Sequence, residues 1–288
     1  MSPVPAFFAS YPSRVDDVLR RLLPANRDGA IERSMAYTLF APSKRVRPVL
    51  TQLSAEICGG TAAHALPAAA AMELVHTASL ILDDLPSMDN APLRRGRPAN
   101  HIEFGEAVAI LAAFGLLNVS YGTLARSYEP ALASRLAALL EEAVGVDGLI
   151  GGQAADLLAT EREIGFELLE RIHRGKTGAL FNASAVAGAM TAGADGESIS
   201  ALSAFARNLG LAFQIVDDLL DVTGTEAETG KVVRTDARKM TFVSFSGVEG
   251  ARALAGELCH TAQAALKPFG RRAARLNELA DFVADRRL

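Results

Sequence analysis

Helical periodicity is the sequence feature that most constrains this fold. Apolar residues recur three and four positions apart in segments rich in Ala and Leu, such as MELVHTASLIL (72–82), FGEAVAILAAFGLL (104–117) and LSAFARNLGLAFQIVDDLLDV (202–222). This spacing is typical of α-helices that bury one face. No stretch shows the alternation of a strand followed by a hairpin turn. The sequence therefore predicts an all-α protein.

Helix breakers separate these segments. Gly59-Gly60, Gly151-Gly152 and Thr223-Gly224-Thr225 are examples, and the connections between the helical segments are short. Short connections are typical of antiparallel neighbours in a helical bundle. There is no low-complexity linker, so we expect residues 1–288 to form one domain.

Composition narrows the class of protein. Hydrophobic residues make up 50% and charged residues 22% of the 288 residues, which provides for a sizeable core. The net charge of −4 and the pI of about 5.8 argue against a nucleic-acid partner. Cys58 and Cys259 have no metal-ligand spacing, and two isolated cysteines fit a reducing compartment. We expect a cytoplasmic protein.

The chain shows no targeting or membrane signal. The N-terminal segment lacks the basic-then-apolar order of a signal peptide. The longest uninterrupted apolar run, Ala107 to Leu117, is shorter than the roughly 18 residues that indicate a membrane span. We therefore expect a soluble protein without a membrane span.

An acidic cluster, DDLLD, interrupts the apolar segment 202–222 with Asp217, Asp218 and Asp221. On a helix Asp217 and Asp221 share a face, and their repulsion costs a few tenths of a kcal/mol. Carboxylate oxygens suit Mg²⁺, which typically takes one or two carboxylates together with water and phosphate oxygens. Alone, the cluster is equally compatible with a solvated acidic face and with a metal site.

A second acidic cluster, in LDDLPSMDNAPLRRGR (82–97), favours the metal site. Pro86 disfavours helix at Leu85, so Asp83 and Asp84 should lie at a helix C-terminus. That end of a helix repels carboxylates and attracts cations. Two carboxylate-rich helices facing each other across a cavity would bind a diphosphate through bridging metal ions.

The two clusters have the forms DDxxxxD and DDxxD. They occur with KRVRP (44–48), His76, LRRGRP (93–98), GGQAAD (151–156), KTGALF (176–181) and Gly230-Lys231. From about Tyr37 onward the chain resembles the trans-isoprenyl diphosphate synthases of the polyprenyl synthetase family, and most of all the bacterial geranylgeranyl diphosphate synthases. The resemblance implies a helical bundle of the isoprenoid synthase type, with a central active-site cavity, in a homodimer.

The resemblance implies a role for each acidic residue. Several Mg²⁺ ions would be held by Asp83, Asp84, Asp89, Asp217, Asp218 and Asp221. Through these ions the site would bind the diphosphate of an allylic substrate, dimethylallyl, geranyl or farnesyl, and assist its ionisation.

The resemblance also implies roles for other polar residues. Lys176 and Lys231 would contact the leaving diphosphate, and Thr177 and Gln214 would face the developing cation. Arg94 would bind the allylic diphosphate. Isopentenyl diphosphate would be bound directly by Lys44, Arg47, His76 and Arg95. Gln153 and Asp156 are supporting candidates, whereas His64, His101, His173 and His260 are interpreted as structural or surface residues.

Product length depends on the residue five positions before the first aspartate, according to the resemblance. Farnesyl synthases often carry an aromatic ring there, whereas this chain has Ala78 followed by Ser79. The open pocket predicts geranylgeranyl diphosphate, with farnesyl diphosphate as the alternative. Phe114 and Leu117 are expected to be further walls of this pocket.

The chain departs from the family pattern at three places. Pro42-Ser43 stands where the family usually has Gly-Gly, which removes one backbone donor beside the isopentenyl diphosphate site. Asn90-Ala91-Pro92 replaces a run that is often acidic, and Ala113-Phe114 replaces a common Gly-Asp pair.

Three other hypotheses compete with a prenyl synthase. A class I terpene cyclase has no isopentenyl site, so KRVRP and Arg95 argue against it. A non-catalytic subunit of a heteromeric synthase commonly lacks metal-binding aspartates, and all six are present here. A purely structural helical protein gives no reason for two acidic clusters.

Overall fold

The computed structural model describes residue 8 and residues 10–23, 28–160, 162–223 and 239–285. Its α-helices are α1 (Ser10–Leu22), α2 (Ala30–Leu39), α3 (Val46–Ile57), α4 (Ala62–Asp83), α5 (Asn100–Phe104), α6 (Glu106–Ser127), α7 (Pro130–Val144), α8 (Leu149–Ala159), α9 (Phe166–His173), α10 (Ala179–Thr191), α11 (Gly196–Thr223), α13 (Phe242–Ala265) and α14 (Ala274–Ala284). The described residues also include a π-helical turn, η2 (Arg174–Gly178), and a 3₁₀ segment, η4 (Lys267–Ala273). The all-α prediction is confirmed.

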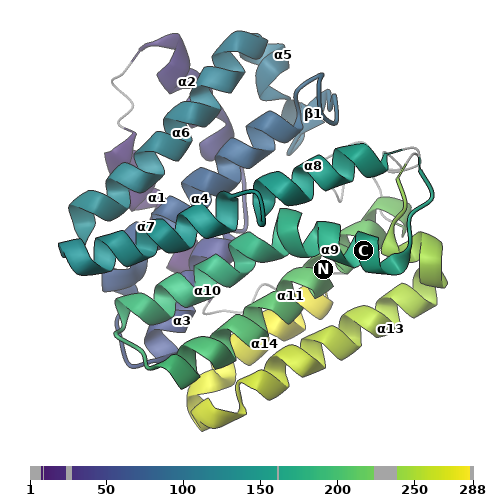
Figure 1. The fold of residues 1–288 in the computed structure, drawn as a ribbon. Coiled ribbons are helices and arrows are strands. Elements are labelled where there is room, and N and C mark those ends of the chain that lie inside the picture. The colour runs from purple at the N-terminus through teal and green to yellow at the C-terminus, as the bar shows by residue number, and fades with distance from the viewer. Residues whose placement is uncertain (1–7, 9, 24–27, 161, 224–238, 286–288) are drawn as a thin grey trace.

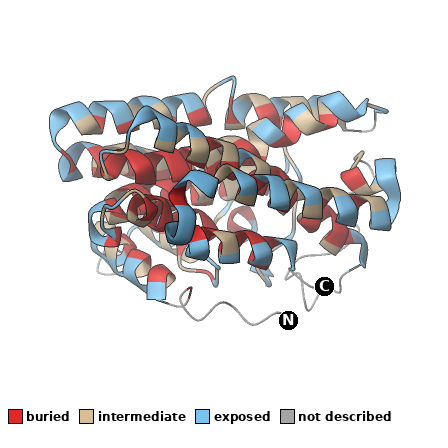
Figure 2. Cartoon of the chain, turned by 90° about the horizontal axis from the view of Figure 1, so that it is seen from below, coloured by how far each residue is buried: buried red, intermediate tan, exposed pale blue. Residues whose placement is uncertain are grey.

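The central helices are α3, α4, α10 and α11. Helix α4 packs against α3 and α6, α10 packs against α3 and α11, and α13 lies along α11 (Figure 1). Buried residues concentrate on the inner helices, while the outer helices are exposed on one face (Figure 2). Residues 183–191 of α10 are buried throughout, and their small Ala, Ser and Gly side chains allow neighbouring helices to approach closely.

A small β-hairpin follows α4. Strands β1 (Leu93–Arg94) and β2 (Arg97–Pro98) are antiparallel, and Arg95 and Gly96 form the turn with φ of 54° and 73°. Two consecutive residues with positive φ match the twist of a two-residue hairpin. The sequence shows no strand alternation here, because strands of two residues are too short to show it. The turn separates the side chains of Arg94 and Arg95.

A close helix contact explains the second glycine of GGQAAD, Gly152. A Cβ atom on Gly152 would lie 2.1 Å from the backbone nitrogen of Lys176. Only glycine therefore allows α8 to lie directly against η2. Because η2 carries Lys176 and Thr177, this contact brings the residues of KTGALF next to Asp156 of α8. π-Helical turns are often found at functional sites.

Three of the described helices, α4, α6 and α11, are long and apolar enough to cross a membrane by length and composition. The apolar 18-residue windows of α4 and α11 are mostly buried inside the bundle, at 67% and 56%, whereas that of α6 is 39% buried. The expectation of no membrane span rested on uninterrupted apolar runs and stays a prediction, as does the single domain.

Candidate active site

A cavity of about 680 Å³ lies between the end of α4, the β1–β2 hairpin, α8, η2, α11 and the start of α13. The residues predicted from sequence that line it are Arg47, His76, Ser79, Asp83, Asp89, Arg94, Arg95, Asp156, Lys176, Thr177, Gln214, Asp217 and Asp218. Lys231 lies outside the described residues. The structure therefore brings most of the predicted site together from six separate stretches of the chain.

The aspartates of the first acidic cluster have two different roles. Asp83 and Asp89 line the cavity, and burial raises the pKa of Asp83 while Lys176 opposes that shift. Asp84 is 1% exposed, does not line the cavity and accepts hydrogen bonds from Arg94, whose Nε lies 3.0 Å from each carboxylate oxygen. Burial also raises the pKa of Asp84, against the effect of Arg94. Asp84 therefore orients Arg94, and Asp83 and Asp89 face the cavity.

The second acidic cluster is divided in a similar way. Asp217 and Asp218 line the cavity, but the carboxylate of Asp218 accepts from Gln214 Nε2 and from the backbone N–H of Phe242, both at 3.0 Å. Gln214 Oε1 in turn accepts the hydroxyl proton of Thr177 at 3.0 Å. This chain of hydrogen bonds joins η2, α11 and α13. Asp221 is 3% exposed and does not line the cavity.

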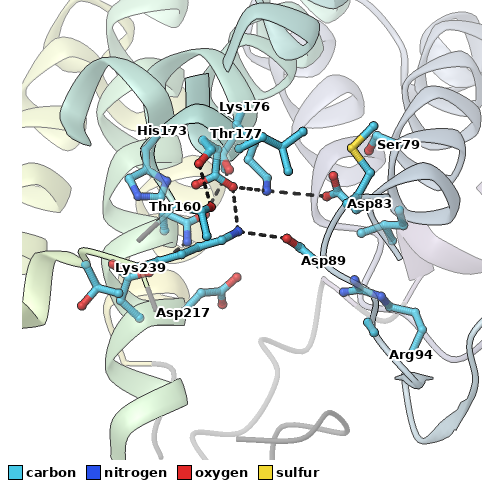
Figure 3. Close-up of a pocket in the computed structure, with 18 of the residues that line it drawn as sticks. Ser79, Asp83, Asp89, Arg94, Thr160, His173, Lys176, Thr177, Asp217 and Lys239 are labelled. Atoms are coloured by element: carbon cyan, nitrogen blue, oxygen red, sulfur yellow. Dashed lines mark hydrogen bonds and ion pairs between the residues drawn. The ribbon is translucent and has the colours of Figure 1, made fainter. Parts of the chain in front are cut away.

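Two lysines lie among the carboxylates. Lys176 Nζ is 2.8 Å from Asp156 Oδ2 and 3.9 Å from Asp83 Oδ2. Lys239 Nζ is 2.9 Å from both Asp89 Oδ1 and Asp156 Oδ2. Figure 3 shows Asp83, Asp89 and Arg94 on one side of the cavity and Asp217 on the other, with Lys239 reaching across.

The pKa values of this group follow from its geometry. Burial raises the pKa of Asp156, but the ammonium groups of Lys176 and Lys239 outweigh burial, and the net shift is downward. Burial disfavours the charged form of both lysines, yet nearby carboxylates raise their pKa values. All three groups are therefore charged at neutral pH. Asp156, which the sequence indicated only as a supporting candidate, forms ion pairs with both lysines.

Sequence reasoning missed Lys239 and His173. Lys239 is a single lysine in the polar stretch RTDARKMT, which has no pattern of its own. His173 was interpreted as structural or surface, but it lines the cavity, and burial lowers its pKa to about 4 despite the opposing effect of Asp156. Its position three residues before Lys176 was the available signal.

The cavity has a cationic corner, formed by Arg47, His76 and Arg95. Arg47 Nη1 lies 3.3 Å from His76 Nε2, and its guanidinium carbon is 4.7 Å from the centroid of the Phe181 ring. Nη1 of Arg95 is buried without a hydrogen-bond partner within the described residues. Burial lowers the pKa of His76 well below its usual value, and the positive charges of Arg47 and Arg95 lower it further. The corner combines a neutral imidazole with two guanidinium groups, which suits an anion with several oxygen acceptors.

Lys44 does not belong to this corner in the structure. It is exposed and does not line the cavity, and its ammonium group lies 5.1 Å from the centroid of the Phe282 ring on α14. Its predicted contact with isopentenyl diphosphate therefore requires a different side-chain position. The nearby Ser43 hydroxyl accepts the backbone N–H of Arg45 at 3.3 Å.

The residues predicted to control product length lie on either side of the cavity wall. Ser79 lines the cavity and donates to the carbonyl of His76 at 2.8 Å. Ala78 does not line it, and is 5% exposed in an apolar cluster with Ala113 and Leu116 of α6. Phe114 is 63% exposed, so its prediction as a pocket wall is wrong for the single chain.

Leu117 also lies away from the residues that surround Ala78. It packs against a different apolar cluster, which contains Leu124, Leu136 and Leu140. The prediction that it forms a wall beyond Ala78 therefore has no support in the packing.

The carboxylates that line the cavity could hold a divalent cation. Within the described residues no three acidic, histidine or cysteine side chains converge on one point. Asp83, Asp89 and Asp217 nevertheless line one cavity with hard oxygen donors. This donor set fits Mg²⁺, because each ion needs only one or two carboxylates when phosphate oxygens and water complete its shell.

Comparisons with known proteins agree with this geometry. The family model described as polyprenyl synthetase matches residues 28–263. A geranylgeranyl diphosphate synthase from Cyanophora paradoxa is 40% identical over 94% of this chain and 93% of its own. A chloroplastic geranylfarnesyl diphosphate synthase from Leucosceptrum canum is also 40% identical, over 94% of this chain and 77% of its own.

A solved structure is similar over nearly the whole length. A geranyltransferase from Helicobacter pylori, complexed with magnesium and isoprenyl diphosphate, has a TM-score of 0.84 and 30% identity. The match covers 98% of this chain and 97% of that protein. The motifs, the all-α fold and these matches agree: the chain belongs to the polyprenyl synthetase family.

Proposed function

We propose that the protein is a trans-prenyltransferase that condenses isopentenyl diphosphate with an allylic diphosphate and makes mainly geranylgeranyl diphosphate. The observation that carries this proposal is the division of one cavity into two anion-binding regions. One is built from carboxylates and lysines, and the other from the cationic corner of Arg47, His76 and Arg95. Two regions of different chemistry suit two diphosphate substrates that are bound in different ways.

The carboxylate region would hold the allylic diphosphate through several Mg²⁺ ions, bound by Asp83, Asp89 and Asp217, with Asp218 beside them. When bound there, magnesium would supply positive charge that offsets the charge of the leaving diphosphate and favours ionisation of the allylic carbon–oxygen bond. Lys176, Lys239 and Arg94 donate hydrogen bonds to the same diphosphate. Asp156 and Asp84 keep these cations in place. Preorganised donors of this kind stabilise charge that develops in the transition state.

Thr177 and Gln214 would face the allylic cation. The Thr177 hydroxyl proton is donated to Gln214 Oε1, so the lone pairs of the Thr177 oxygen remain available toward the cavity. Gln214 is itself oriented by Asp218. A fixed oxygen dipole stabilises a nearby cation without forming a covalent bond to it.

The cationic corner would bind isopentenyl diphosphate without metal. Arg47 and Arg95 supply guanidinium donors, and neutral His76 supplies one N–H. The corner also argues against the terpene cyclase alternative, which has no second diphosphate to bind. The presence of all six aspartates of the two acidic clusters argues against a non-catalytic subunit.

The product length rests on Ala78. The family resemblance makes this position the floor of the pocket, and here Ala78 lies directly behind Ser79, which lines the cavity. A small side chain at the floor would let the chain grow, and each added isoprene unit gains burial of five more carbons. Relatives at the same identity include proteins named for different product lengths. We therefore derive the twenty-carbon product from Ala78 and keep farnesyl diphosphate as the alternative.

We further propose a cytoplasmic homodimer. The support for a dimer is the outer face of α6, on which Leu111 and Phe114 are 56% and 63% exposed. Large exposed apolar side chains are typical of interaction surfaces. The support for the location is the presence of two free cysteines, which fits a reducing compartment.

Product analysis tests the proposed function. The protein is incubated with isopentenyl diphosphate, magnesium and each allylic diphosphate in turn, and the prenyl chain lengths are measured. We expect a main product of twenty carbons. No condensation with any allylic substrate would contradict the proposal, and a main product of fifteen carbons would support the farnesyl alternative.

A further inference from the structure

We propose that the N-terminal helix α1 positions the cationic corner for isopentenyl diphosphate, through an ion pair between Asp16 and Arg45. This inference rests on the proposed function. Asp16 lies before residue 28, where the family-model match begins. The inference makes α1 a part of the substrate site that the matched region does not contain.

Arg45 is a buried hub. It is 3% exposed, and its Nε and Nη2 each lie 3.0 Å from Asp16 Oδ1 on α1. Its Nη1 donates to Glu73 Oε1 of α4 at 2.6 Å, and its Nη2 donates to the carbonyl of Leu39 at 2.6 Å. All three guanidinium nitrogens are therefore held by acceptors from α1, α4 and the end of α2.

Two parallel contacts join the start of α3 to α4. Arg45 contacts Glu73, and Arg47, two residues later, contacts His76, three residues after Glu73. Arg47 and His76 line the cavity, whereas Arg45 and Glu73 do not. Since both contacts span the same helix pair, the buried Arg45–Glu73 pair sets the position from which Arg47 reaches His76. Arg45 is a positioning residue, because it acts through Arg47.

The backbone at Arg45 requires this anchor. Its φ of 51° and ψ of 39° are left-handed, a conformation that residues other than glycine rarely adopt. Such a conformation persists only where surrounding contacts hold it. The Asp16 carboxylate is one of these contacts and approaches from outside the α3–α4 pair. Its loss should loosen the turn that places Arg47.

Asp16 allows the inference to be tested without removing a core residue. Its side chain is 31% exposed, and its neighbour Asp17 is exposed and has no ion pair among the described contacts. Asp16→Asn keeps the size of the side chain but removes its charge. Asp17→Asn makes the same change in charge one position away and is the matched control.

The experiment compares wild type, Asp16→Asn and Asp17→Asn by calorimetric titration with isopentenyl diphosphate and by steady-state kinetics. We expect Asp16→Asn to raise the Kd and the KM for isopentenyl diphosphate about fivefold, with the KM for the allylic substrate within twofold of wild type. Asp17→Asn should match wild type. Arg45→Lys, which keeps the charge but loses the planar fork, should show the same selective change.

The outcomes separate this inference from the proposed function. If wild type binds isopentenyl diphosphate and both Asp16→Asn and Arg45→Lys bind it equally well, the positioning role is overturned while the proposed function stands. Equal increases in both KM values would also overturn it, because they indicate a general loss of structure. If wild type does not bind isopentenyl diphosphate at all, the proposed function fails.

Discussion

The ammonium nitrogen of Lys239 lies 2.9 Å from Oδ1 of Asp89, a residue 150 positions earlier in the chain. Asp89 follows α4 and Lys239 precedes α13, so this ion pair crosses the cavity (Figure 3). The lysine thus holds a carboxylate that we propose binds Mg²⁺. The ammonium group of Lys239 and a bound metal ion would therefore compete for the same carboxylate oxygen of Asp89.

Lys239→Met should let Mg²⁺ bind the substrate-free protein more tightly, because it removes this competitor. Both partners are partly exposed, so the pair contributes about 1 kcal/mol, equivalent to roughly a fivefold shift. In a thermal-shift titration the Mg²⁺ midpoint should move to lower concentration by that factor. Lys267→Met, on an exposed lysine, is the control. An unchanged or higher midpoint would contradict the competition.

The aspartates of the second acidic cluster should contribute unequally to catalysis. Asp217 lines the cavity, whereas Asp221 is buried outside its lining. We expect Asp217→Ala to lower kcat by several orders of magnitude, as should Asp83→Ala or chelation of divalent ions. The factor by which Asp221→Ala lowers kcat should be at least tenfold smaller than the factor for Asp217→Ala. The test is to measure kcat for both variants with saturating Mg²⁺. Equal losses of kcat would place Asp221 among the metal ligands.

Helices such as α11 were predictable because they bury one apolar face with a regular period. Both acidic clusters were predictable because carboxylates in apolar helices need a compensating cation. The structure was needed for Asp84 and Asp218, since neighbouring aspartates look alike in sequence. Only the folded structure shows that one orients Arg94 and the other accepts a hydrogen bond from Gln214.

Other residues could not be predicted for different physical reasons. Helix α6 is apolar on nearly all sides, so its periodicity does not reveal that Phe114 is exposed. Lys239 takes its role from partners distant in the chain. Arg45 looked like one more cation of KRVRP, but its left-handed backbone and its burial make it an anchor.

Substitutions in the two substrate-binding regions should change the KM values of different substrates. Arg47→Ala and His76→Ala remove donors from the cationic corner without touching a carboxylate that faces the cavity. We expect the KM for isopentenyl diphosphate to rise at least tenfold, because a hydrogen bond to a charged group contributes about 1.5–3 kcal/mol. The KM for the allylic substrate should change far less. Equal increases in both values would contradict the assignment of this corner.

The buried His173 should make the free energy of unfolding of the metal-free protein decrease as the pH falls below neutral. Burial lowers the folded-state pKa of His173 to about 4, whereas an unfolded histidine titrates near about 6.5. The unfolded state therefore binds more protons between these values, and the free energy of unfolding decreases as pH falls through this window. For His173 alone the loss at pH 4 is about 3 kcal/mol.

His173→Gln should reduce the slope of unfolding free energy against pH by about one proton in this window. Urea unfolding between pH 5 and pH 7 measures the slope. His260→Gln, on an exposed histidine, should leave the slope unchanged. A wild-type slope that His173→Gln does not alter would show that this histidine is not buried in its neutral form.

Ala78→Tyr should shorten the product. Ala78 is 5% exposed between the cavity wall and the apolar cluster that contains Ala113 and Leu116. This cluster is close-packed, so a tyrosine ring cannot be inserted there without displacing α6, which would cost about 1–3 kcal/mol or more. We expect the ring to turn toward the neighbouring Ser79, which lines the cavity through which the growing chain must pass.

We therefore expect Ala78→Tyr to shift the main product from twenty to fifteen carbons while turnover persists. Ala78→Ser, which adds a single oxygen atom, should keep the twenty-carbon product and serves as the control. Chain lengths are measured with all substrates in excess. A wild type that already stops at fifteen carbons would contradict the open pocket, because a residue as small as Ala78 would then not set the limit. A tyrosine variant that still makes twenty carbons would show that the chain grows along another wall.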